Sequence, residues 1–264
     1  MFANERYAAI LRRLQAQGSV TVAELMEAFG VSIETVRRDL AHLEAQNALA
    51  RVHGGAVRVE QLRPMAALAQ RRLECPAQKR AVANAAAALL HEDDWIFLDS
   101  GSTALLTAQA LRARFRHLSV ITNSLEVFSC LAEGGDFSLY LAGGEYMPAE
   151  QAFFGAQTLS FVRSFHTVHA LICPSSISLR NGVCDFIAPL MDVQRAMMEC
   201  TDETVFLADS AKFQAAAPLR LCPLSPAQRI VTDASLPPEL AAAFRDASLR
   251  IDCTAVPEAA PHRP

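Results

Sequence analysis

Between Cys75 and Cys253 the chain alternates short apolar runs with helical segments, and this alternation limits the possible folds more than any other feature of the sequence. Each run is continuously apolar and stops at a polar or glycine-containing loop. Apolar strands separated by helices are typical of a mostly parallel sheet that is covered on both faces. We therefore predict an α/β domain over residues 75–253, with strands at Trp95–Asp99, Leu118–Thr122, Phe137–Gly143, Val168–Cys173, Thr204–Asp209, Arg229–Asp233 and Leu249–Cys253.

Residues 1–59 have a different pattern, in which three amphipathic helices are followed by a short hairpin. The second helix begins at Thr21, whose spacing to Glu24 is that of a capping box, and Ser32 caps the third helix. After the third helix, two β-prone runs flank a Gly-Gly turn, and glycine tolerates the positive φ that such a turn requires. The pattern predicts a small α+β domain, a winged helix-turn-helix.

The remaining segments connect or follow these two domains. A chain of 264 residues has the length of two domains. Its 52% hydrophobic and 20% charged residues indicate a folded protein, because a disordered chain is more polar. Residues 60–74 are charged, contain proline and lack a periodic pattern, so we expect a linker there, and the proline-rich residues 254–264 predict a loose tail.

Several classes of site are not supported by the composition. The seven cysteines are scattered and never spaced as C-x-x-C, which argues against a disulfide framework and a zinc knuckle. His166 and His169 lack cysteine or carboxylate partners at ligand spacing. No apolar stretch approaches the roughly 20 residues that a membrane span needs. We expect a cytoplasmic protein with no metal, no cofactor and no membrane contact.

The third predicted helix carries hydrogen-bond donors on its exposed face. The net charge is −4, so any contact with DNA must come from a local basic cluster. Arginine forks such as Arg37 and Arg38 can bind guanine edges or grip phosphates. The alternative is an ordinary solvated helix face, in which both arginines pair with Glu34 or Asp39. We place the DNA contacts at Ser32, Thr35, Arg37, Arg38, His42, Arg51, His53, Gly54 and Gly55.

Polar loops follow several of the predicted strands. The run from Asp99 to Thr103 lies between a strand end and a helix start, where backbone N–H groups, hydroxyls and the helix dipole can converge on an anion. In an open parallel sheet such loops collect at the carboxyl ends of the strands. Taken singly, each loop is also an ordinary turn or helix cap, and Lys212 is also readily explained as a surface lysine. The candidate ligand residues are Asp99, Ser100, Gly101, Ser102, Thr103, Thr122, Asn123, Ser124, Gly143, Gly144, Asp185 and Lys212.

The segment VSIETVRRDLAHLEAQNALARVHGGA, from Val31 to Ala56, resembles the signature of DeoR/GlpR-type repressors, in which a V-S-x-x-T-[IV]-R-R-D-L helix precedes R-x-H-G-G-A. The resemblance continues less strictly to about Cys253. It implies a DNA-binding repressor of carbohydrate-metabolism genes, whose sensor domain resembles ribose-5-phosphate isomerase. It also implies a phosphorylated sugar effector that releases double-stranded operator DNA. Because one winged helix covers only a few base pairs, we expect a homo-oligomer, either a dimer or a tetramer.

The main alternative function is a sugar-phosphate isomerase with an attached DNA-binding domain. Such an enzyme needs a positioned carboxylate to move a proton between neighbouring carbons. The resembled isomerases carry it in a turn after a central strand, and the corresponding turn here, from Cys173 to Ser176, contains no carboxylate. We therefore expect no catalytic residue and no enzyme activity. A purely structural DNA-binding protein is a third possibility, but it leaves the polar loops without a role.

Overall fold

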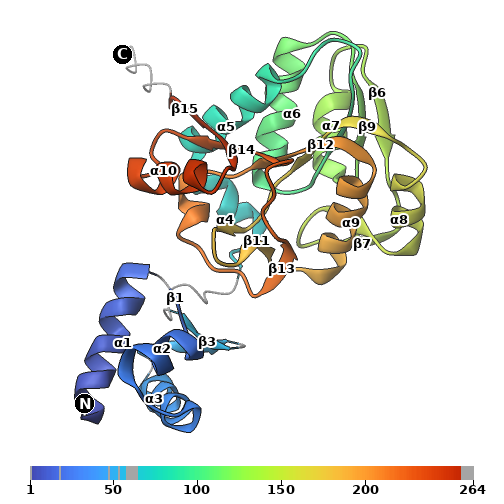
Figure 1. Ribbon diagram of the computed structural model, residues 1–264. Helices are drawn as coiled ribbons and strands as arrows, with labels where there is room; N and C mark the ends of the chain where they lie inside the picture. Colours follow the sequence, from blue (N-terminus) through green and yellow to red (C-terminus); the bar gives the residue numbers. More distant parts are fainter. Residues whose placement is uncertain (1, 18, 47, 53, 58–64, 257–264) are drawn as a thin grey trace, which may run out of the picture. The chain divides into compact units, whose positions relative to one another are not determined.

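The computed structural model of the chain describes residues 2–17, 19–46, 48–52, 54–57 and 65–256. The chain divides into two compact units, one of Met1–Met65 with Ala216–Pro218 and one of Ala66–Ala215 with Leu219–Pro264. Figure 1 labels the elements of both units. Within the described ranges, no helix is long and apolar enough to cross a membrane.

The smaller unit is the predicted winged helix-turn-helix, and its helix ends follow the sequence signals. Thr21 Oγ1 accepts a hydrogen bond from Glu24 N at 3.1 Å, and Glu24 Oε2 accepts one from Thr21 N at 2.8 Å, so the capping box is confirmed. Gly30 ends the second helix with φ 62°, and the Ser32 side chain caps the third. Three antiparallel strands pair in the order β1-β3-β2. The elements are α1 (Ala3–Gln17), β1 (Ser19–Thr21), α2 (Val22–Phe29), α3 (Ile33–Ala45), β2 (Ala50–Val52) and β3 (Gly55–Val57).

The third helix, α3, is fixed by an apolar core and by one buried ion pair. Arg6 of α1 donates two hydrogen bonds to the Asp39 carboxylate of α3, at 2.6 and 2.9 Å. Asp39 is only 2% exposed, and two charge-assisted hydrogen bonds offset the loss of its hydration. The pair therefore sets the rotation of α3 against α1. The apolar core of this unit contains Ile10, Leu14, Val20, Leu25, Val36, Leu40, Leu43, Leu49 and Ala56.

The larger unit contains one seven-stranded sheet, in the order β15-β14-β12-β9-β4-β5-β6. Every neighbouring pair of strands is parallel. Each predicted apolar run forms one of these strands, so the prediction of a mostly parallel sheet is confirmed. The strands are β4 (Trp95–Leu98), β5 (Ser119–Thr122), β6 (Ser138–Leu141), β9 (Thr167–Ile172), β12 (Thr201–Leu207), β14 (Arg229–Asp233) and β15 (Arg250–Thr254).

Both faces of this sheet are buried under helices. In β4, Ile96 and Leu98 belong to one apolar core and Phe97 to the other, because successive side chains point to opposite faces. The core of Ile96 includes residues of α5, α6 and α7, and the core of Phe97 includes residues of α8, α9 and α10. The helices are α5 (Pro76–Ala88), α6 (Ser102–Arg114), α7 (Leu125–Ala132), α8 (Ala156–Val162), α9 (Ala188–Glu199), α10 (Pro238–Asp246) and the 3₁₀ helix η2 (Ser210–Phe213).

Some elements of the larger unit are not among the sequence predictions. Two small antiparallel sheets join β7 (Glu145–Met147) to β8 (Ala152–Phe154), and β10 (Ser176–Ser178) to β11 (Gly182–Asp185) and β13 (Leu219–Cys222). These strands have three or four residues each, and most of them mix polar and apolar side chains, so they show neither a long apolar run nor a clear alternation.

The segment 60–74, expected to be a linker, contains the helix α4 (Leu68–Leu73), which belongs to the larger unit. Tertiary contacts stabilise α4, since Leu68 is buried and Lys79 Nζ donates hydrogen bonds to the carbonyls of Arg71 and Glu74 at the end of the helix. A helix held by contacts with the rest of the domain leaves little local signal in its own sequence.

Candidate functional site

The exposed face of α3 carries the two arginines predicted to contact DNA. Arg37 and Arg38 are both exposed, and neither forms an ion pair with any residue that the structure describes. Asp39, which the alternative assigned to them as a partner, is held by Arg6. Both guanidinium groups are therefore available to phosphates or base edges.

The other predicted DNA contacts on α3 are bonded within the smaller unit. Ser32 Oγ caps the helix and lies 3.1 Å from Thr35 Oγ1. The His42 ring stacks on Tyr7 with the ring centroids 4.6 Å apart, and its Nε2 lies 3.0 Å from Gln46 Nε2. These contacts hold the side chains in fixed positions on the same helix as the arginines.

The wing brings one further arginine to the surface. Arg51 is exposed, and its backbone N–H donates to Glu44 Oε1 at 3.0 Å. Gly54 has φ 85° with open space around it, as a turn tip requires. Gly55 has a packing role, because a Cβ there would lie 2.0 Å from the Val20 carbonyl oxygen. His53 lies outside the described residues.

In the larger unit, the loops after the parallel strands share the carboxyl edge of the sheet. Asp99 Oδ2, after β4, accepts hydrogen bonds from Cys173 N at 2.9 Å and from Gln194 Nε2 at 2.8 Å. The same Gln194 amide donates to Asp185 Oδ2 at 3.4 Å, and Asp185 is the last residue of β11. The structure thus brings two predicted ligand residues, Asp99 and Asp185, to one side chain of α9.

The loop between β4 and α6 has the free donors of an anion site. α6 begins at Ser102 without a side-chain cap, so the first N–H groups have no partner within the helix. Ser100, Ser102 and Thr103 are 9%, 7% and 5% exposed, and their hydroxyls make no hydrogen bond among the described residues. Gly101 turns the chain with φ 105°. Free N–H groups, free hydroxyls and the positive end of the helix dipole together suit a phosphate or carboxylate.

Asp99 supports this loop and is itself fully engaged. Besides its contacts with Cys173 and Gln194, its Oδ1 accepts a hydrogen bond from Ser100 N at 2.7 Å. Burial raises the pKa of Asp99 to about 6, and the three hydrogen bonds oppose this rise. The carboxylate therefore uses its oxygens to hold the loop before α6 in place.

The loops after β5 and β6 are also tied down internally. Thr122 Oγ1 accepts a hydrogen bond from Ser124 N at 3.0 Å, and the Ser124 side chain caps α7. Asn123 donates through Nδ2 to a backbone carbonyl of β8, while its buried Oδ1 has no hydrogen-bond partner among the residues that the structure describes. The Gly143 carbonyl accepts a hydrogen bond from a threonine of α8, and a Cβ on Gly144 would lie 2.3 Å from that hydroxyl. Among the polar groups of these two loops, Asn123 Oδ1 is therefore available to accept a hydrogen bond from a ligand.

Lys212 lies in a cluster of charges at the end of β12. It is half-buried in η2, beside Asp209. Burial raises the pKa of Asp209, and the charges of Lys212 and Lys79 oppose this rise. Burial also raises the pKa of the Cys173 thiol, and Lys212 again opposes it. The ammonium group therefore acts on groups at the ends of two neighbouring strands, β9 and β12.

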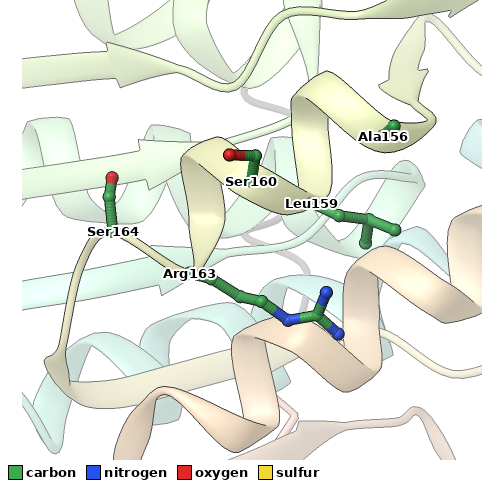
Figure 2. Close-up of a pocket in the computed structure, with 5 residues that line it drawn as sticks. All are labelled: Ala156, Leu159, Ser160, Arg163 and Ser164. Atoms are coloured by element: carbon green, nitrogen blue, oxygen red, sulfur yellow. The ribbon is translucent and has the colours of Figure 1, made fainter.

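A surface hollow of about 530 Å³ lies elsewhere, along α8 (Figure 2). It is lined by Ala156, Leu159, Ser160, Arg163 and Ser164, which come from α8 and the residues that follow it. Arg163 points toward α9 in Figure 2, where its Nη2 lies 3.4 Å from Glu199 Oε2. Because Arg163 already pairs with Glu199 and the other lining residues are uncharged, this hollow offers less to an anion than the loop before α6.

Comparison with known proteins assigns both units. The model of the DeoR-like helix-turn-helix domain matches residues 6–62, and the model of the DeoR C-terminal sensor domain matches residues 74–234. The chain belongs to the DeoR family. The transcriptional repressor AccR of Agrobacterium fabrum is 34% identical over 79% of this chain and 81% of its own length. The glycerol-3-phosphate regulon repressor of Escherichia coli is 28% identical over 94% of this chain and 98% of its own.

Among solved structures, ribose-5-phosphate isomerase A of Neisseria gonorrhoeae matches with a TM-score of 0.38 and 15% identity. The match covers 52% of this chain and 53% of that one. The curated relatives are named transcriptional repressors or transcriptional regulators, and the two family models match both units, so this chain is a DNA-binding transcriptional regulator of the DeoR family. The isomerase alternative is therefore not retained.

Four residues that contact or support the loops at the carboxyl edge were not among the predicted site residues. Gln194 joins Asp99 to Asp185, Asp209 faces Lys212, Lys79 supports α4, and Arg71 of α4 lies beside Gly101. Asp209 could have been found, because it begins the D-S-A-K-F run after a strand. The other three lie on helices, where no turn or loop signal marks them. No group of three potential metal ligands occurs among the described residues.

The buried carboxyl group of Asp99 predicts a pH dependence. Its folded-state pKa of about 6 exceeds the ordinary 3.8, so the folded state binds more protons than the unfolded state between these values. The contribution of Asp99 to the free energy of unfolding should therefore fall by about 3 kcal/mol as the pH rises from 4 to 7. Asp99→Asn should remove that part of the fall, as measured by urea unfolding at each pH. Parallel pH profiles for the wild type and the variant would contradict the assignment.

Proposed function

We propose that this DeoR-family repressor reads operator DNA through α3 and the wing, and that a phosphorylated sugar bound at the carboxyl edge of the large sheet releases the DNA. The free anion donors before α6 are the observation on which the sensing half depends. In this proposal the residues predicted from the sequence form the ligand site, with Asp99, Thr122, Ser124 and Gly143 supporting its loops through their internal hydrogen bonds.

The DNA-binding half is supported by the charges on α3. Arg37 and Arg38 are exposed without ion pairs among the described residues, while the nearby Asp39 is neutralised by Arg6. The fixed Arg6–Asp39 pair orients the helix so that this basic face is presented to solvent. Arg51 of the wing is a further exposed arginine of this unit.

The chemistry of the carboxyl edge supports a phosphorylated polyol as the ligand class. The loop before α6 offers donors, which suit a phosphate. By contrast, Asn123 Oδ1, Gln194 Oε1 and Asp209 Oδ2 are buried acceptors with no partner in the described part of the chain, and a donor such as a sugar hydroxyl would satisfy each of them. The relative from Escherichia coli is named for glycerol 3-phosphate, which is also a phosphorylated polyol.

Replacing Arg37 or Arg38 with alanine should weaken operator binding by about 1 to 3 kcal/mol for a base contact. A phosphate contact should instead lower affinity for all sequences alike. The operator can be selected from a pool of random duplexes by the wild-type protein, and affinities measured by fluorescence anisotropy at fixed salt. Arg80→Ala, an exposed arginine of α5, serves as the control. Full affinity in the Arg37→Ala/Arg38→Ala protein would contradict this part of the proposal.

Lys212→Ala should bind the operator normally but fail to release it when the effector is added, because the variant lacks the ammonium that holds the phosphate. The effector is first identified by thermal-shift screening of phosphorylated and unphosphorylated sugars, since a bound ligand stabilises the folded state. Release of labelled operator is then titrated for the wild type, for Lys212→Ala and for Arg220→Ala as an exposed control.

Two results of this titration would change the proposal. Equal release by the wild type and Lys212→Ala would remove Lys212 from the ligand site. Tighter operator binding in the presence of effector would reverse the sign of the coupling, because a ligand shifts the equilibrium only toward the state that binds it better.

A homo-oligomer should present two DNA-binding units to half-sites separated by about one helical turn or a multiple of it. A fragment ending at Val59 contains the whole apolar core of the smaller unit but lacks the larger unit. It should therefore bind the selected operator much more weakly than the full chain does. Sedimentation of the full chain gives its oligomeric state, and equal affinity of fragment and full chain would refute the oligomer.

A further inference from the structure

Arg71 of α4 holds together segments that are far apart in the sequence. Its Nε donates to the Ala66 carbonyl at 2.9 Å, and its Nη2 donates to Glu150 Oε2 in the turn between β7 and β8. The side chains of Arg71 and Glu150 are 14% and 7% exposed. Lys79 anchors the end of the same helix through the carbonyls of Arg71 and Glu74. The guanidinium group is therefore held in one position.

The remaining nitrogen of Arg71 lies beside the anion loop. Nη1 is 3.7 Å from the point where a Cβ on Gly101 would lie, and it makes no hydrogen bond among the described residues. Gly101 directly precedes α6, whose first N–H groups have no side-chain cap. A fixed cationic donor thus lies next to the free N–H groups and hydroxyls of that loop, and it comes from a different element.

We propose that Arg71 completes the anion site before α6 and connects it to Ala66, the first residue of the larger unit, so that a bound phosphate immobilises Ala66–Leu73. This inference rests on the proposed function, because it concerns the same ligand site. Ala66 follows the chain segment that comes from the DNA-binding unit. Arg71 is the side chain that contacts both the ligand loop and this entry point.

The buried Glu150 determines which nitrogen of Arg71 a phosphate binds. Leaving its carboxylate without a partner is costly, so a phosphate should add to the free Nη1 and not displace Glu150 from Nη2. With phosphate bound, all three guanidinium nitrogens of Arg71 donate hydrogen bonds. The segment from Ala66 to Leu73 then loses conformational freedom. A planar fork can bridge three partners in this way, whereas a lysine ammonium on a flexible stem retains the charge without the bridge.

The test uses the full chain with inorganic phosphate as the probe, at constant ionic strength. Wild type should show a rise in Tm with phosphate, and slower deuterium exchange in the peptide that covers Ala66–Leu73. The variant Arg71→Gln/Glu150→Gln, which removes both members of the buried pair, should lose about tenfold or more in phosphate affinity and lose the protection. Arg71→Lys should keep part of the Tm rise and lose the protection.

The matched control is Arg72→Gln on the same helix, where the more exposed Arg72 pairs with Glu126 of α7, and it should respond like the wild type. A wild-type response in Arg71→Gln/Glu150→Gln, or wild-type protection in Arg71→Lys, would overturn the role of Arg71 and leave the proposed function intact. Absence of any response of the wild type to phosphate and to the whole panel of sugar phosphates would overturn the anion site and this inference with it.

Discussion

The parallel direction of all strands in the large sheet is the constraint on which the candidate site depends. Parallel strands end at the same edge, so loops that are separated by many residues in the sequence meet there. Asp99, after β4, can accept a hydrogen bond from Cys173 N only because β4 and β9 are adjacent and end together. Burial of both faces keeps this edge in register, because a one-residue shift of a strand would move each side chain into the opposite core, where it does not fit.

The hydrogen bonds within the loops determine which groups remain for a ligand. Thr122, Ser124 and Gly143 use their oxygens to hold neighbouring backbone or side chains. The groups that remain fall into two kinds, the donors before α6 and the buried acceptors represented by Gln194 Oε1. A ligand that carries both an anion and hydroxyl donors matches the two kinds together, which a simple inorganic anion does not.

The sequence predicted the elements whose signals are local. Each strand of the large sheet is an apolar run bounded by a loop, and the capping box at Thr21 is visible from two residues. The roles of the site residues were less predictable, because they depend on tertiary contacts. The sequence predicts five equivalent ligand residues from Asp99 to Thr103. In the structure, Asp99 is buried and its three hydrogen bonds hold the loop before α6 in place. The role of Arg71 could not be predicted from the residues around it, since it depends on tertiary contacts with Glu150 and Gly101.

The distribution of basic residues shows why α4 can take part in the site. Arginine provides 22 of the 24 basic side chains, and the two lysines, Lys79 and Lys212, both lie close enough to Asp209 to oppose the rise in its pKa. At Lys79 a compact ammonium is required, because it is buried and must donate to two carbonyls at the end of one helix. This buried contact fixes α4, and α4 in turn places the Arg71 fork against the anion loop. Lys79 therefore holds α4 in place, and Arg71 on α4 connects Ala66 and Glu150 to the loop before α6.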